Sequence, residues 1–136
     1  KEYRRQRQMC IRDSIGFRQV EETHLMENLI YNELRIRGYL VDVGVVPIRV
    51  KDVDGAYRRS QLEVDFVCNL GYARVYVQSA YRLPTEEKRK QEMASLLKID
   101  DSFRKIIITE DLIKRHMDEN GVEWVNVYDF LKSEEL

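Results

Sequence analysis

The segment LEVDFVCNLGYARVYVQSA, residues 62–80, indicates two short strands joined by a turn around Gly71. Side chains alternate between the faces of a strand, so we expect Glu63 and Asp65 on one face of the first strand. The opposite face is expected to hold Leu62, Val64 and Phe66. The two carboxylates are then about 7 Å apart, so that a cation, a base or strong donors must relieve their repulsion. The segment therefore suggests a metal site.

The composition predicts one globular domain without an overall nucleic-acid-binding charge. The chain has 136 residues, of which 43% are hydrophobic, enough for a single core. Its 23 Lys and Arg nearly balance its 24 Asp and Glu, with a net charge of -1. Because no global basic field is present, any nucleic-acid function must depend on a local site.

The cysteines and the hydropathy predict a reduced cytoplasmic protein with no membrane span. Cys10 and Cys68 are too few for a metal-binding quartet or for the disulfide framework of a secreted protein. No apolar run approaches the roughly 20 residues of a transmembrane helix, and no signal-peptide pattern is present.

The first fourteen residues are expected to be a non-native or disordered leader. Four arginines in KEYRRQRQMCIRDS could suggest a phosphate-binding arm. However, MCIRDS, residues 9–14, resembles the translation of an adaptor used in sequencing libraries. We therefore assign residues 1–14 to the leader and residues 15–136 to a single domain.

Residues 22–37 show the apolar spacing of a helix, with Gly38 as the C-terminal stop. Apolar side chains occur on more than one face, which predicts a well-buried helix. Glu27 shares a side with Ile30, Tyr31 and Leu34 and so points toward packed surroundings. Its charge must then be compensated. The alternative is a carboxylate at the edge of the apolar stripe, bonded to backbone or to a nearby Arg.

Three strands are expected to follow as an antiparallel meander. The first covers residues 39–50, and one of its two faces is predicted to hold Tyr39, Val41, Val43 and Val45. Gly44 and Pro47 interrupt this strand and indicate a bulge or an edge position near Pro47. Asp54-Gly55 predicts a tight hairpin to the second strand. The third strand, residues 73–80, is expected to present Tyr76, Gln78 and Ala80 on one face and Val75, Val77 and Ser79 on the other.

The C-terminal half predicts a helix, a buried strand, a further strand and a short closing helix. Thr85 is the expected N-cap of the helix, and KIIIT, residues 105–109, is typical of a strand that pairs in parallel. Asn120-Gly121 predicts a turn before the strand at residues 122–127, and the closing helix is expected at residues 128–131. The basic run at residues 88–90 is either a solvated helix face or a phosphate contact. His24 and His116 lack partners at ligand spacing and are interpreted as ordinary polar residues.

The order of these elements, αβββαβ, resembles the PD-(D/E)XK nuclease superfamily, with Glu27 on the first helix, Asp65 on the second strand and Gln78 on the third. More closely, FRQVEETHLMENLIYNELRIRGY, QLEVDFV, VYVQSAYRLPTEEKRKQE and LLKIDDSFRKIII look like the C-terminal domain of unknown function of prokaryotic AAA-type ATP-binding proteins. The resemblance covers about residues 16–131. It implies an α/β (α+β) fold with a mixed sheet flanked by helices.

The resemblance also implies site residues. Glu27, Asp65 and Gln78 match the catalytic positions, and Glu27, Glu63 and Asp65 are candidate ligands for Mg²⁺. Ala80 stands where the family has a lysine that stabilises developing negative charge. The site is therefore expected to be vestigial, at most that of a weak Mg²⁺-dependent nuclease.

ATP binding would belong to a separate upstream module, because the sequence contains no GxxxxGK[ST] loop to hold the phosphates. Two functional hypotheses follow. The first is a nuclease-like, nucleic-acid-associated module with impaired or no cleavage activity. The second is a non-enzymatic module for protein interaction or for regulating the attached ATPase.

Overall fold

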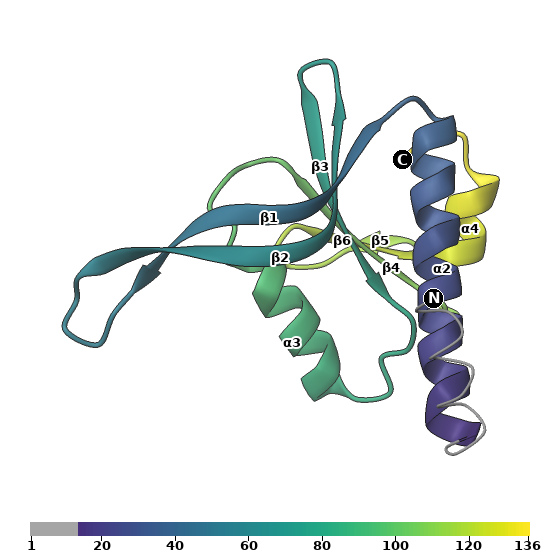
Figure 1. The fold of residues 1–136 in the computed structure, drawn as a ribbon, viewed down its shortest axis with the longest axis horizontal. Coiled ribbons are helices and arrows are strands. Elements are labelled where there is room, and N and C mark those ends of the chain that lie inside the picture. Colours follow the sequence, from purple (N-terminus) through teal and green to yellow (C-terminus); the bar gives the residue numbers. More distant parts are fainter. Residues whose placement is uncertain (1–13) are drawn as a thin grey trace, which may run out of the picture.

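The structure is a computed structural model that describes residues 14–136, with side chains from Val20 onward (Figure 1). Its elements follow in the order α2 (Ser14–Ile36), β1 (Leu40–Lys51), β2 (Tyr57–Leu70), β3 (Ala73–Ala80), α3 (Glu86–Leu97), β4 (Arg104–Thr109), β5 (His116–Met117), β6 (Val122–Asn126) and α4 (Val127–Lys132). The expected αβββαβ order is confirmed. Within the described residues, no helix is long and apolar enough to cross a membrane.

The strands form one mixed sheet in the order β1-β2-β3-β4-β6-β5. β1, β2 and β3 pair antiparallel as the expected meander, and β4 pairs in parallel with both β3 and β6. β4 is buried along KIIIT because it lies in the centre of the sheet. The sequence did not predict β5, which is only two residues long.

Helices cover both faces of this sheet (Figure 1). On one face, α2 and α4 pack in a core that we call the α2-side cluster, which includes Met26, Ile30, Leu34, Phe66, Val77 and Phe130. On the other face, α3 packs in the α3-side cluster, which includes Val46, Ile48, Val64, Tyr76, Ala80 and Leu96. The predicted faces of β3 are confirmed, since Val75 and Val77 lie in the first cluster and Tyr76 and Ala80 in the second.

Helix and turn boundaries follow the predicted local signals. Gly38 ends α2 with a φ of 89°, and the amide of Tyr39 donates to the carbonyl of Leu34. Thr85 caps α3, because its hydroxyl accepts from the amide of Lys88 at 3.2 Å. Gly55 and Gly121 adopt positive φ in the predicted turns.

Two predictions for α2 are wrong. The helix begins at Ser14 rather than at Glu22, so the proposed leader lies outside the described residues except for its last residue. The helix is also buried along one side only, because the sheet covers only that side. Outward-facing Leu25, Leu29 and Ile36 are 60%, 45% and 79% exposed.

β1 and β2 extend beyond the sheet as a two-stranded ribbon, residues 44–64, that we call the arm (Figure 1). β2 pairs with β3 only from Phe66 to Leu70, so residues 57–65 of β2 have β1 as their only neighbouring strand. The edge position predicted for β1 is confirmed.

A bulge at the base of the arm corrects the predicted strand faces. Two residues of β2, Asp65 and Phe66, lie opposite Val43 alone, because the pairing shifts between Asp42 and Gly44. Beyond this shift the side chains of β2 exchange faces, whereas those of β1 keep their alternation. Val43 and Val45 therefore stay on the predicted face with Tyr39 and Val41, but they are 80% and 55% exposed, because the arm extends beyond the α2-side cluster.

The same bulge separates apolar residues of β2 that were expected on one face. Val64 belongs to the α3-side cluster and Leu62 packs against it, whereas Phe66 belongs to the α2-side cluster. Strict alternation across the bulge was wrong, because the extra residue reverses the order of the faces.

Candidate functional site

Asp65 lies where β2 separates from β3. Side-chain hydrogen bonds connect it to β3 at this point, in place of the regular backbone pairing between the two strands. Its Oδ2 accepts from the amide of Ser79 at 2.8 Å. Its own amide donates to Oε1 of Gln78 at 3.2 Å. These bonds fix the carboxyl group at the junction between the arm and the sheet, so Asp65 and Gln78 are brought together as the sequence predicted.

Three carboxylates influence one another around Asp65. The pKa of Asp65 is raised from 3.8 to about 6, chiefly by burial; the bond from the Ser79 amide opposes this rise, and the charges of Glu27 and Glu92 add to it. Among the described residues, no Lys or Arg contributes to this balance. The site therefore concentrates negative charge without a Lys or Arg side chain to offset the charge of Asp65.

Glu27 approaches Asp65 from α2 across a cavity of about 300 Å³. The cavity is lined by Glu27, Asn28, Tyr31, Val43, Asp65 and Phe66. The Glu27 side chain is 32% exposed, and its Oε2 lies 3.5 Å from Nδ1 of His24. Glu27 is thus a half-buried carboxylate at the edge of the helix stripe, and the partner it finds is His24 rather than the backbone or an Arg.

Glu92 of α3 is the acidic residue that sequence reasoning missed. Its Oε2 accepts from Nε2 of Gln78 at 3.4 Å, so the amide of Gln78 bridges Asp65 and Glu92. Spacing could have identified it, because Glu92 lies four residues before the buried Leu96 and therefore shares its side of the helix.

Glu63, by contrast, does not line the cavity. It is exposed on the arm, opposite Val45. Ala80 is buried in the α3-side cluster, and its methyl group brings no charge to the site. Glu63 and Ala80 lie on the strands that the sequence predicted. The prediction that Glu63 joins Glu27 and Asp65 at one site does not agree with its position on the arm.

The donor set fits a hydrated Mg²⁺ better than a metal enclosed by protein. Among the side chains of residues 20–136, no group of three or more His, Cys, Asp or Glu is arranged to hold a metal. Mg²⁺, however, commonly keeps several waters and uses one or two carboxylates. Glu27 and Asp65 could provide these, whereas Oε1 of Gln78 already accepts from the amide of Asp65.

The basic run on α3 and the second histidine lie at a different surface. The guanidinium of Arg89 lies 4.9 Å from the ring centre of Trp124, and His116 stacks on the same indole at 6.4 Å. Lys88 and Lys90 are exposed. Arg89 is therefore partly a packing residue, and His116 is an aromatic partner rather than an isolated polar residue.

Comparison with known proteins gives one relative and no family. No protein-family model matches the chain. The chain is similar to an uncharacterized protein of Haemophilus influenzae, with 30% identity over 120 residues. This match covers 88% of the chain but 26% of that protein. The chain therefore spans about a quarter of the length of the relative that it matches.

Proposed function

We propose that this chain is a nuclease-like module that associates with nucleic acid through a divalent cation at the acidic cavity, with impaired or no cleavage. The supporting observation is the set of carboxylates at Asp65, where no described Lys or Arg side chain offsets the charge of Asp65 and the Ser79 amide holds it in place. Phosphate groups also need a cation before they can approach such a site.

The residues favour binding over cleavage. Mg²⁺ would neutralise phosphate oxygens and lower the pKa of a bound water. Glu27 and Asp65 would hold this ion, and Gln78 would keep Asp65 in place. The buried methyl group of Ala80 offers no charge to stabilise the developing negative charge of hydrolysis. The site can therefore hold a metal and a phosphate while lacking one of the groups that phosphodiester cleavage uses.

We further propose that the chain is the C-terminal part of a prokaryotic AAA-type ATP-binding protein of the cytoplasm. The similar Haemophilus influenzae protein is much longer than this chain, which leaves room for an upstream module. Any ATP binding would reside there, because the chain has no phosphate-cradling loop.

A second candidate function is a protein-interaction or regulatory module of the attached ATPase. It is favoured by the outward side of α2, where Leu25, Leu29 and Ile36 are exposed at helical spacing. This function requires neither the metal nor the nucleic acid.

A thermal-unfolding experiment tests the metal site. We expect Mn²⁺ or Mg²⁺ at ten times its dissociation constant to stabilise the chain by about 1.4 kcal/mol, which corresponds to roughly 4–8 °C in Tm. Asp65→Asn should abolish this gain, whereas Asp100→Asn, which removes an exposed carboxylate elsewhere, should retain it. Equal Tm values with and without metal would contradict the metal site.

A cleavage assay with the same ions tests the catalytic part. We expect the unmodified chain to leave single- and double-stranded DNA intact. The comparison variant is Ala80→Lys, which supplies the missing ammonium group, and circular dichroism should verify that it folds. Metal-dependent cleavage by the unmodified chain that Asp65→Asn abolishes would show that the lysine is dispensable here.

A further inference from the structure

We propose that the arm binds the phosphate backbone of double-stranded DNA through one cationic face, an inference that rests on the proposed nucleic-acid function. This face consists of Arg49, Lys51 and Arg59, with Tyr57 beside them. It lies away from the acidic cavity and provides the positive surface that the overall charge of -1 does not predict.

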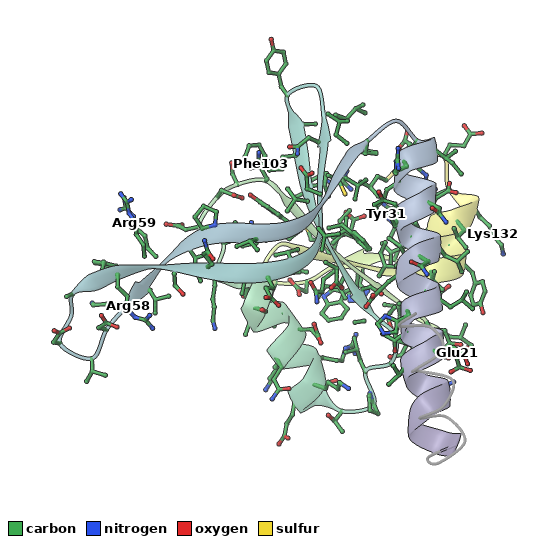
Figure 2. The ribbon with its side chains drawn as sticks, viewed as in Figure 1. Glu21, Tyr31, Arg58, Arg59, Phe103 and Lys132 are labelled. Carbon is green, nitrogen blue, oxygen red and sulfur yellow. The ribbon has the colours of Figure 1, made fainter. Side chains whose placement is uncertain are left out.

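The register of the arm brings these side chains together. Arg49 pairs with Arg59, and Lys51 pairs with Tyr57, so the four residues occupy adjacent positions of the two strands. Val46 and Ile48 point into the α3-side cluster. Alternation then directs Arg49 and Lys51 to the opposite face. All four side chains are exposed, and Figure 2 shows Arg59 on the side of the ribbon away from α3.

The pairing of Arg49 with Arg59 is unfavourable by itself. Like charges directly opposite each other destabilise a ribbon, because their Cβ atoms lie about 4.5–5.5 Å apart. The adjacent Arg58, on the other face, has a partner, since its Nε lies 2.8 Å from Oδ1 of Asp52. None of the three cations of the face forms an ion pair with a side chain of residues 20–136.

A role in protecting the sheet edge explains only part of this arrangement. Charged residues on an edge strand prevent pairing with another sheet, and Pro47 on β1 serves the same purpose. Edge protection requires charge of either sign, and opposite charges would serve without repulsion. Three unpaired cations on one face are better explained by an anionic partner.

Duplex DNA matches both the shape and the charge of the arm. The major groove, about 12 Å wide, admits a two-stranded β-ribbon. A duplex also carries one negative charge per roughly 1.7 Å of its axis, so each exposed cation can meet a phosphate. The exposed Tyr57 adds a hydroxyl group that can bond to a phosphate oxygen. Glu63, at the base of the same face, directs the polyanion toward the tip.

Fluorescence anisotropy with a labelled duplex of about 20 base pairs, from about 50 to 200 mM NaCl, tests the inference with the full chain. Arg49→Gln/Arg59→Gln should weaken binding at least about tenfold. It should also reduce the slope of log K against log salt by about 2, because two phosphate contacts are lost. The matched control, Lys98→Gln/Lys132→Gln, removes two exposed cations elsewhere and should change neither value.

Thermal unfolding separates this result from misfolding. Removal of the arginine pair should leave Tm unchanged or higher, because it relieves repulsion. If the unmodified chain binds the duplex and Arg49→Gln/Arg59→Gln binds equally well, the arm is not the contact surface, although the proposed function stands. If the unmodified chain does not bind the duplex, the arm inference is overturned; if it also binds no nucleic acid with Mg²⁺ present, the proposed function is overturned as well. Binding of poly-glutamate in place of DNA, with the same loss in the variant, would assign the arm to an acidic protein and refute the DNA inference.

Discussion

Asp65 makes the stability of the protein depend on pH in a defined direction. The fold raises its pKa from 3.8 to about 6, chiefly by burial, so the folded protein keeps the proton longer than the unfolded chain does. The free energy of unfolding must therefore fall as the pH rises from about 4 to 6. A pKa shift of this size corresponds to a change of about 3 kcal/mol in the free energy of unfolding. Because solvent near the carboxyl group screens its charge, we expect a change of about 1–3 kcal/mol.

Asp65→Asn should accordingly stabilise the protein at neutral pH when metal is absent. The amide oxygen can still accept from the amide of Ser79, while the repulsion by Glu27 and Glu92 is lost. We expect the free energy of unfolding of Asp65→Asn to exceed that of the unmodified chain by about 1–2 kcal/mol at about pH 7.5. Between about pH 4 and 6, the fall with rising pH that Asp65 causes should be absent. Urea unfolding in EDTA measures both, with Asp100→Asn as the control. A loss of stability in Asp65→Asn at neutral pH would contradict the repulsion among the three carboxylates.

The individual site residues could be predicted from sequence only where local rules hold. The carboxylate of Asp65 was noticed in the strand pattern and Gln78 was named through the family resemblance, and the fold brings the two residues into contact. Glu92 was missed because it is one of many charges on α3, although its spacing from Leu96 places it on the side of the helix that packs on the sheet. Glu63 was overestimated, because the arm carries it away from the cavity.

At the level of the strands, the bulge depends on the absence of a side chain at Gly44. A Cβ atom there would lie 2.4 Å from Cγ2 of Val67 and 3.4 Å from the carbonyl oxygen of Val64. Val67 is buried and branched, so it cannot easily move aside. β1 and β2 can therefore approach closely at this point only because residue 44 is a glycine.

Gly44→Ala should destabilise the protein by about 1–3 kcal/mol, as overpacking of a core commonly does. The variant should also weaken the metal-dependent gain in Tm, because the bulge positions Asp65. The second variant is Gly44→Ala/Val67→Ala, which removes the clashing methyl group and should be less destabilised than the sum of its two single changes. Additive losses, measured by urea unfolding, would show that the two residues do not clash.

Elements proved more predictable than the places where they change direction. The αβββαβ order, Thr85 as a cap and β4 as a buried parallel strand all follow from local patterns. The bulge at Asp65 was not located, since Gly44 signals an irregularity without indicating the register beyond it. The extra turns of α2 were also missed, because Ser14 is not followed by a clear apolar stripe.

At the scale of the whole molecule, Arg37 joins the first helix to the last. Its Nη2 donates to the carbonyl oxygens of Phe130 and Ser133, both at 2.6 Å, and its Nε donates to Oε1 of Glu33 at 3.0 Å. Its guanidinium also lies 4.5 Å from the ring centre of Phe130. These contacts satisfy carbonyl groups at the C-terminal end of α4. The last carbonyl groups of a helix have no amide partner within the helix itself.

Arg37→Ala should lower the free energy of unfolding by about 3 kcal/mol, because hydrogen bonds from a charged donor contribute about 1.5–3 kcal/mol each. Arg37→Lys should lose less, but cannot reach all three acceptors from one ammonium group. Arg35→Ala, an exposed neighbour on α2, is the control and should change stability by less than about 0.5 kcal/mol. Equal effects of Arg37→Ala and Arg35→Ala in chemical unfolding would exclude this role.

The contacts of Arg37 also have a kinetic consequence. Arg37 and Phe130 are 93 residues apart in the chain, whereas β1, β2 and β3 are joined by tight turns. Closing a long loop costs more entropy than closing a hairpin, so we expect the meander to form early and the junction of α2 with α4 to form late. Loss of this junction in Arg37→Ala should then speed unfolding and leave the folding rate nearly unchanged. Arg37 would thus govern the lifetime of the folded protein rather than the time it needs to fold.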